Sequence, residues 1–245
     1  MAFPDHFSAV SAAYAAYRPR YPPELSRILA SLAPPGTAWD VGCGSGQLTT
    51  QLAEHIDVIG TDPSEAQVEQ AFPHARASYR VASAEASGLP DQSVTLVVAA
   101  QAAHWFEWPT FIAEVERVAV SGALVALVSY GILHVDDPVV EPIVQRFYFD
   151  VVGSYWPKER AHVENGYRGL VMPWPPVSAP AIEMTETWSR DELCGYVSTW
   201  SATSKMVKAN GPAQFDALRS ELAAVWPDPE KRVIRWPLTL KLARR

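Results

Sequence analysis

A glycine-rich turn between an apolar run and an amphipathic stretch most constrains how this chain can fold. The run at residues 37–39 leads into Asp40, and the turn places glycines at Gly42, Gly44 and Gly46. Glycine adopts positive φ readily and lets a ligand approach the backbone closely. The apolar positions that follow recur on one helical face, at Leu48, Leu52 and Ile56. Strand, glycine turn and helix in this order predict the first βα unit of a nucleoside-binding sheet.

An acidic residue follows the second apolar run of the chain. Asp62 closes residues 58–60 and stands about 20 residues after Gly42, the spacing at which a carboxylate meets a ribose diol in such folds. We therefore expect the ligand to carry an adenosine-like ribose.

The identity of that nucleoside depends on glycine spacing and on charge. A dinucleotide fingerprint requires a third glycine at position 47, which is Gln47 here. No Lys or Arg lies between Arg27 and Arg76, although this segment holds several acids. S-adenosylmethionine has no phosphate and carries a sulfonium and an ammonium group, so an acidic glycine-lined pocket favours it over NAD.

Strand and helix patterns alternate after the first turn. Strands are predicted at residues 37–41, 57–62, 77–82, 94–100 and 123–129, with helices at 45–56, 64–72 and 109–120. The two last strands are nearly continuous apolar runs, which is typical of buried parallel strands. The pattern predicts an α/β fold with a Rossmann-like doubly wound sheet and a ligand at the carboxyl ends of its strands.

Beyond Tyr130 this alternation stops. We expect one domain over 1–245, divided into an N-terminal helical lid (1–36), a cofactor-binding core (37–130), an inserted cap (131–180) and a C-terminal part of the sheet (181–245). The last part holds an alternating strand pattern at 182–188, a capping box of Ser189 with Glu192, a helix opened by Pro212, and a closing strand at 233–242. A helix is also predicted over residues 7–17.

The chain resembles the class I S-adenosylmethionine-dependent methyltransferases, and more narrowly the small-molecule branch that includes trans-aconitate methyltransferase. The segments that carry the resemblance are residues 17–22 (YRPRYP), 40–46 (DVGCGSG), 84–85 (AE) ahead of 89–90 (LP), 101–106 (QAAHWF) and 199–202 (TWSA). The resemblance implies a seven-stranded sheet, mostly parallel with an antiparallel last strand.

The resemblance also implies roles for individual residues. Asp40 and the glycines face the methionine moiety, Asp62 the ribose, Ala84 and Glu85 the adenine, and Gln101 the methionine amine through its backbone. The lid contributes Tyr14, Tyr17, Arg18 and Tyr21, with Tyr14 and Arg18 at the cofactor. The residues expected around the acceptor are Tyr21, Trp105, Tyr155, Trp156 and Trp200.

His104 is the one histidine placed for chemistry, after the fourth strand. Its ordinary pKa near neutrality suits a general base, but methyl transfer chiefly requires positioning. A carboxylate acceptor is already ionised, whereas a phenol, an alcohol or an acidic C–H needs a base. We therefore favour His104 as an orienting residue over an obligatory base, and both alternatives stay open.

Composition limits the partners. The 245 residues carry a net charge of −7, which disfavours nucleic acid and anionic membranes. The two cysteines form no disulfide framework, and no His/Cys cluster has metal spacing, so no metal is expected. No apolar run approaches the ~18 residues of a membrane span. We expect a cytoplasmic monomer or homodimer.

The predicted function is methylation of a small molecule, with O-methylation of a carboxylate or hydroxyl favoured. The alternatives are a C- or N-methyltransferase of secondary metabolism, an NAD-type oxidoreductase, and a cofactor-binding protein without transferase activity.

Overall fold

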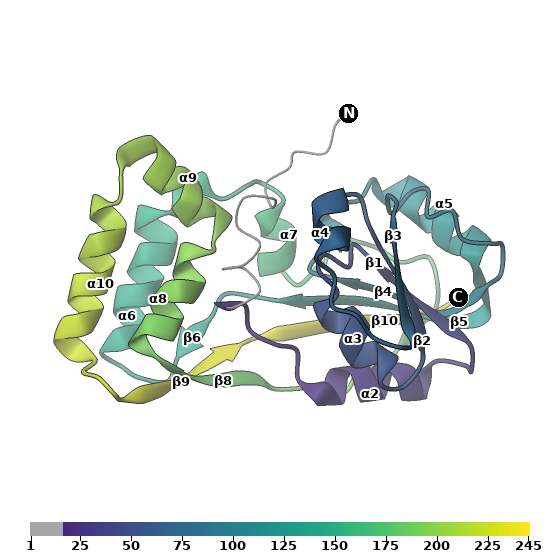
Figure 1. The fold of residues 1–245 in the computed structure, drawn as a ribbon, viewed down its shortest axis with the longest axis horizontal. Coiled ribbons are helices and arrows are strands. Elements are labelled where there is room, and N and C mark those ends of the chain that lie inside the picture. Colours follow the sequence, from purple (N-terminus) through teal and green to yellow (C-terminus); the bar gives the residue numbers. More distant parts are fainter. Residues whose placement is uncertain (1–16) are drawn as a thin grey trace.

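The computed structural model of the protein describes residues 17–245. The helix predicted over residues 7–17, except for Tyr17, and the lid residue Tyr14 lie outside the described residues. The described chain forms two lobes, an α/β core and a helical cap, which lie side by side in Figure 1.

The core is built on a seven-stranded sheet. Its first five strands are parallel, and β10 runs antiparallel to both of its neighbours, β5 and β7. In spatial order the strands are β3 (Ala77–Val81), β2 (Asp57–Asp62), β1 (Thr37–Val41), β4 (Val94–Ala100), β5 (Ala119–Tyr130), β10 (Leu238–Arg244) and β7 (Pro176–Val177). The prediction of a seven-stranded, mostly parallel sheet with an antiparallel last strand is confirmed.

Successive strand residues enter opposite hydrophobic cores. In β4, Leu96 and Val98 join the cluster on one face, whereas Val97 and Ala99 join the cluster on the other. Successive side chains of a strand point to opposite faces of the sheet, so a strand that is apolar throughout needs both faces covered. Helices cover both faces here. The helices are α2 (Pro23–Leu32) and α3 (Gln47–Ala53) on one face, α5 (Trp108–Val118) on the other, and α4 (Glu65–Glu69) beside β2 and β3.

The cap is larger than the sequence predicted. It holds a second, three-stranded antiparallel sheet in the order β6 (His134–Val135), β9 (Lys231–Trp236) and β8 (Met184–Ser189). Its helices are α6 (Val140–Arg146), α8 (Arg190–Ser198), α9 (Ser201–Asn210) and α10 (Ala213–Val225). The expectation that 181–245 continues the main sheet is therefore wrong except for β10, because β8 and β9 pair with each other and with β6.

Pro237 divides the predicted closing strand in two. Trp236 pairs with Met184 in the cap sheet, whereas Leu238 pairs with Tyr130 in the core sheet. Proline has no N–H to donate and a fixed φ, so a ladder cannot run through it unchanged. The chain crosses from cap to core at this residue, and the Pro237 carbonyl accepts a hydrogen bond from the Gly131 N–H at 2.9 Å, where β5 leaves the core.

The segment between the two lobes contacts both of them. It contains η2 (Phe147–Val151), η3 (Gly153–Tyr155) and α7 (Arg160–Glu164). η2 and η3 lie against α6 and α9 of the cap, whereas α7 and the residues after it pack on the core. Val163, Tyr167 and Leu170 belong to the same buried cluster as α5. This segment therefore holds the cap against the carboxyl end of the core sheet.

Gly46 is the N-cap residue of α3, and its backbone adopts the left-handed conformation with φ of +82°. A Cβ at Gly46 would lie 2.4 Å from the hydroxyl oxygen of Tyr79, whereas one at Gly122, also at φ +82°, would meet nothing within 4 Å. Both alanine variants carry the same backbone strain, so Gly46→Ala should cost about 1–3 kcal/mol more unfolding free energy than Gly122→Ala. Urea denaturation of the two variants measures the difference, and equal losses would contradict this account of Gly46.

Candidate functional site

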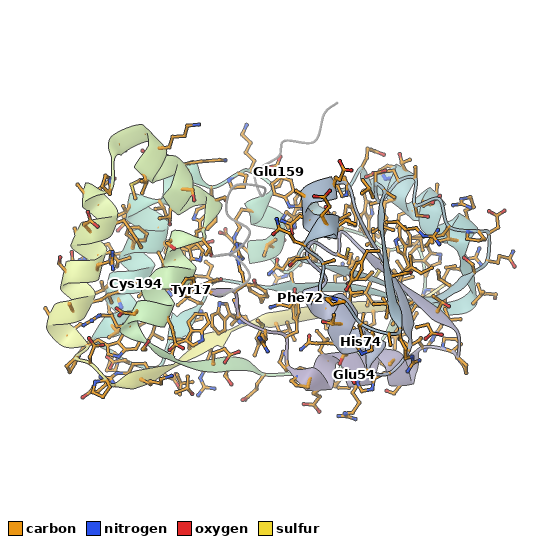
Figure 2. The ribbon with its side chains drawn as sticks, in the orientation of Figure 1. Tyr17, Glu54, Phe72, His74, Glu159 and Cys194 are labelled. Atoms are coloured by element: carbon orange, nitrogen blue, oxygen red, sulfur yellow. The ribbon has the colours of Figure 1, made fainter. Side chains whose placement is uncertain are left out.

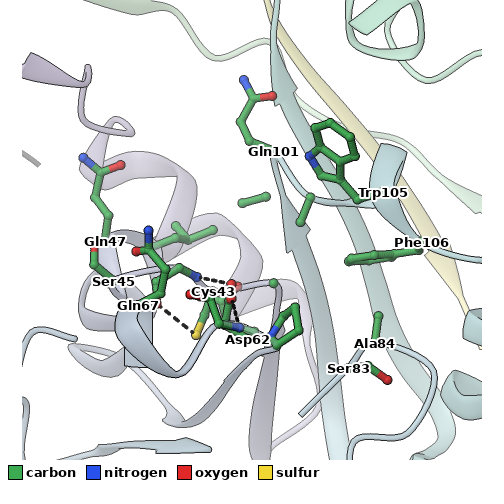
Figure 3. Close-up of a pocket in the computed structure, with 18 of the residues that line it drawn as sticks. Cys43, Ser45, Gln47, Asp62, Gln67, Ser83, Ala84, Gln101, Trp105 and Phe106 are labelled. Atoms are coloured by element: carbon green, nitrogen blue, oxygen red, sulfur yellow. Dashed lines mark hydrogen bonds between the residues drawn. The ribbon is translucent and has the colours of Figure 1, made fainter. Parts of the chain in front are cut away.

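A cavity of about 330 Å³ opens at the carboxyl ends of β1, β2 and β4. Figure 3 shows the glycine turn and Asp62 on one side of it, and Gln101, Trp105 and Phe106 on the other. Predicted cofactor residues from several segments line this one cavity: Arg18, Asp40, Gly42, Gly44, Asp62, Ala84, Glu85 and Gln101.

The glycine turn is fixed to the neighbouring strands by its backbone. The N–H groups of Gly42 and Cys43 donate to the Thr61 carbonyl at 2.8 and 3.0 Å. A Cβ at Gly42 would lie 2.5 Å from the Cβ of Ala102, so only glycine lets the loop after β4 approach this closely. The turn thereby brings the ends of β1, β2 and β4 to the same cavity.

Gly46 does not line this cavity. Its φ and its contact with Tyr79 give it a packing role instead, which differs from the predicted contact with cofactor.

Asp40 is a buried carboxylate with one unpaired oxygen. Thr49 donates its hydroxyl to Oδ2 at 2.6 Å, whereas Oδ1 is buried and has no hydrogen-bond partner among the described residues. Burial raises the pKa of Asp40 to about 7, against the opposing hydrogen bond from Thr49, and the nearby charge of Asp62 raises it further. A buried acceptor without a donor is costly, so a cationic N–H donor from a ligand suits this position.

Asp62 is already bound by backbone donors. Gly44 N–H donates to Oδ2 and Ser64 N–H to Oδ1, both at 2.9 Å. Burial raises the pKa of Asp62, and these two hydrogen bonds oppose that shift. Each carboxylate oxygen retains a second lone pair, which leaves Asp62 able to accept two hydroxyl groups from a ligand.

The remaining walls come from the loops after β3 and β4. Glu85 Oε1 accepts the Glu107 N–H at 2.9 Å, which connects the predicted adenine loop to the start of α5. Gln101 has φ of +53°, and its side-chain amide donates to the Tyr130 carbonyl at 3.0 Å. Strained backbone of this kind often occurs at functional sites.

A second cavity of about 180 Å³ lies between the core and the cap. It shares Arg18, Gln101 and Trp105 with the first cavity, so the two spaces adjoin at these residues. Of the residues predicted around the acceptor, Trp105, Trp156 and Trp200 line it, and so does His104. Tyr21 lines only the first cavity.

Tyr155 lines neither cavity. Its hydroxyl accepts a hydrogen bond from the Asn210 side chain at 2.6 Å. Tyr155 is the last residue of η3, and the chain turns there. Trp156 therefore lines the second cavity, whereas Tyr155 does not. The predicted substrate contact of Tyr155 is therefore corrected.

His104 is neutral in the folded protein. Burial lowers its pKa to about 3, and the positive charges of Arg160 and His162 lower it further. Its Nδ1 lies 3.0 Å from the hydroxyl oxygen of Tyr167. The expectation that His104 has a pKa near neutrality is wrong. Burial and the two cationic neighbours lower the pKa, and neither can be seen in the sequence around His104.

Cationic and donor groups gather around the second cavity. Arg160 and Lys205 line it together with Arg18, and none of the described lining residues is Asp or Glu. The Arg160 guanidinium donates from Nε to Tyr148 Oη at 3.1 Å, and the same nitrogen forms an ion pair with Glu164 at 3.7 Å. Trp156 adds a buried indole N–H that has no partner in the described part of the chain.

Sequence reasoning missed most of the cap residues at this cavity. Tyr148, Arg160, Tyr196 and Lys205 come from four different helical segments, and no local motif marks them. The sequence prediction also left out four residues of the first cavity that lie close in the chain to the predicted motifs. Their nearness to those motifs was the available signal, and they are Gln47, Ser64, Gln67 and Phe106.

The segment before α2 bridges the lobes. Arg18 donates from Nη1 to the Tyr130 hydroxyl at 3.2 Å and lies over the Tyr196 ring, 5.6 Å from its centroid. The Tyr17 ring packs against Gly195 of α8, next to Cys194 (Figure 2). A Cβ added at Gly195 would lie 2.4 Å from ring carbons of Tyr17. Glycine at position 195 therefore makes room for this contact.

In residues 17–245, no helix is both long and apolar enough to cross a bilayer. Within the same residues, no group of three or more His, Cys, Asp and Glu side chains is arranged to hold a metal ion.

The chain is similar to known methyltransferases. A methyltransferase-domain family model matches residues 39–127. A Dictyostelium discoideum protein named as a methyltransferase is 30% identical over 252 residues, covering 99% of this chain and 96% of that protein. A structure from Anaeromyxobacter dehalogenans, named as a type II methyltransferase, is 44% identical with a TM-score of 0.86, covering 93% and 98% of the two chains. A Mycobacterium tuberculosis protein named as an uncharacterized methyltransferase is 37% identical over 126 residues, 50% of this chain and 51% of its own length.

The raised pKa of Asp40 predicts that cofactor binding depends on pH, if this carboxylate binds the cofactor as expected. With a pKa of about 7, its carboxyl is protonated below that pH and must lose a proton to bind a cationic group. The Kd for S-adenosylmethionine should therefore rise below pH 7 by up to about tenfold per pH unit. Calorimetry at pH 6 in buffers of different ionisation heat should detect proton release. Asp40→Asn should bind weakly and without this dependence, and a wild-type Kd constant from pH 5.5 to 8 would contradict the assignment.

Proposed function

This chain belongs to the class I S-adenosylmethionine-dependent methyltransferases, and we propose that it methylates the carboxylate of a small organic acid. The first cavity would bind the cofactor and the second the acceptor. The trans-aconitate-like branch, a cytoplasmic location and a monomeric or homodimeric state stay predictions.

The charge of the second cavity supports this proposal most. Three cationic side chains line it, and no acidic one does among the described residues. Cations and N–H donors stabilise an anion rich in oxygen atoms and disfavour an amine. The aromatic rings of Tyr148, Trp156 and Trp200 give the same cavity apolar surface for the rest of the acceptor.

The residues of the first cavity fit the cofactor. S-adenosylmethionine supplies a methyl group activated by a positively charged sulfur. Asp40 would accept from its ammonium group and Asp62 from its two ribose hydroxyls, as the unpaired Oδ1 and the free lone pairs allow. Ala84 and Glu85 would face the adenine, and Gln101 and Arg18 lie where the two cavities adjoin.

The acceptor needs no proton transfer if it is a carboxylate. It is ionised at neutral pH, and the demand on the protein is alignment of the reacting atoms at about 3–3.5 Å. An alcohol needs a base whose pKa lies near the working pH, and His104, at about 3, is a weak one. The neutral His104 therefore suits orientation of the acceptor, and a carboxylate is favoured over a hydroxyl.

A methyl-acceptor screen tests the proposal. Small organic acids and their neutral amides and alcohols are incubated with methyl-labelled cofactor and the full-length enzyme. Label should enter the acids, and mild alkali should release it as methanol, because esters hydrolyse whereas ethers, N-methyl and C-methyl groups do not. Alkali-stable label would identify one of the other methyltransferase classes. Cofactor binding without transfer to any acceptor would favour a binding protein.

Lys205 and Lys208 give a matched test of the acceptor cavity. Both lie on α9, but Lys205 lines the cavity whereas Lys208 is exposed. Lys205→Met should raise the KM of the acid by about tenfold, since it removes one charge-assisted interaction. Lys208→Met should leave the KM unchanged. Equal effects of the two substitutions would remove Lys205 from acceptor recognition.

A further inference from the structure

Tyr167 combines three unusual properties that the cofactor and acceptor roles do not explain. It is fully buried, it is a bulky residue at positive φ, and its hydroxyl lies 3.0 Å from His104 Nδ1. It lines neither cavity. Its contact with ligands would therefore pass through His104.

The backbone at Tyr167 is held in place from several directions. Gly166 and Tyr167 adopt consecutive left-handed conformations, with φ of +63° and +56°. For a side chain with a Cβ this costs about 1–2 kcal/mol, and such strain persists only where the surroundings impose it. Lys241 of β10 donates from Nζ to the carbonyls of Tyr167 and Leu170 at 3.0 and 2.8 Å, and the Tyr167 N–H donates to the backbone carbonyl of His162 at 2.7 Å.

Hydrogen-bond accounting fixes the direction of the contact with His104. Burial raises the pKa of Tyr167, so its phenol keeps its proton at neutral pH. Among the described residues, His104 Nδ1 is the only hydrogen-bond acceptor at that hydroxyl, because the other group that contacts its oxygen is the backbone N–H of His104, a donor. If Nδ1 carried the imidazole proton, the buried phenol O–H would have no acceptor, at a cost of about 1–3 kcal/mol. The phenol therefore donates to Nδ1, and the single proton of the neutral imidazole lies on Nε2.

We propose that Tyr167 is a positioning residue that keeps the proton of His104 on Nε2, so that this N–H is the donor offered to the acceptor. Nε2 makes no hydrogen bond with a described residue, and His104 lines the second cavity. In the opposite tautomer a lone pair on Nε2 would repel a carboxylate oxygen. The part of this inference that concerns the acceptor rests on the proposed function, whereas the part that concerns the tautomer does not.

The charged groups around His104 are consistent with a neutral donor. Arg160 and His162 are the groups that act on it electrostatically, and both disfavour a second proton on the ring. The adjacent Trp105 ring and the stacked Tyr167 ring, 4.9 and 6.0 Å away between centroids, limit ring rotation. An imidazole held in this way can orient an acceptor without exchanging protons with it.

The tautomer can be read directly in the free enzyme. Nitrogen-15 NMR of labelled protein at pH 7, with the His104 signals assigned by comparison with His104→Ala, should show one neutral tautomer protonated on Nε2. Tyr167→Phe should give a mixture of tautomers while the protein stays folded by its melting curve. A wild-type signal protonated on Nδ1 would overturn the proposal even if the variant failed to fold.

Kinetics of a double-mutant cycle separate positioning from general structural damage. With the acid acceptor found in the screen, Tyr167→Phe should raise its KM by about 5- to 20-fold and leave the Kd for S-adenosylmethionine unchanged. In a His104→Ala background the same substitution should have no further effect on KM. Additive effects would overturn the proposal. A tautomer shift without any methylated acid would instead contradict only the proposed function.

Discussion

The burial of one carboxylate, Asp40, at the end of the first strand organises the ligand site. Its Oδ2 accepts the hydroxyl of Thr49 in α3, its Oδ1 is buried with no hydrogen-bond partner among the described residues, and the residue lines the cavity. This arrangement exists because β1 lies between β2 and β4 and because glycine at position 42 lets the loop after β4 approach. A chain that buries an acceptor in this way gains most from a ligand that brings a positive donor.

The second cavity, where we propose that the acceptor binds, depends on how the chain connects its two lobes. The chain first leaves the core after Tyr130, comes back to it through α7 and β7, enters the cap again at β8 and makes its last return at Pro237. The hydrogen bond between Gly131 and Pro237 joins the first and the last of these crossings. The second cavity lies beside this junction, with Gly131 in its wall. Both lobes therefore contribute residues to the second cavity, whereas the first cavity is lined mainly by the core.

The sequence predicted the core well because its signals are local. The strands at 37–41, 57–62 and 94–100 were predicted at the bounds the structure has, and the capping box of Ser189 and Glu192 is confirmed. Pairing is not local, so the alternating pattern at 182–188 did not reveal that β8 belongs to a different sheet. Pro237 was the available signal for the break between β9 and β10.

The same distinction applies to the site. Motif residues such as Asp40, Asp62 and Gln101 lie at one edge of the sheet, as parallel topology requires, and they line one cavity. Arg160, Lys205 and Tyr167 approach the acceptor region or His104 only through tertiary packing. The low pKa of His104 likewise arises from burial and from two neighbours, Arg160 and His162, that lie more than fifty residues away in the chain.

The dependence of kcat on pH tests the central claim that methyl transfer here needs no protein base. With both substrates saturating, kcat should be constant between about pH 6 and 8.5, because His104 with a pKa of about 3 does not titrate there. A kcat that falls as the pH drops through about 6.5, with that fall absent in His104→Gln, would instead show that His104 acts as a base.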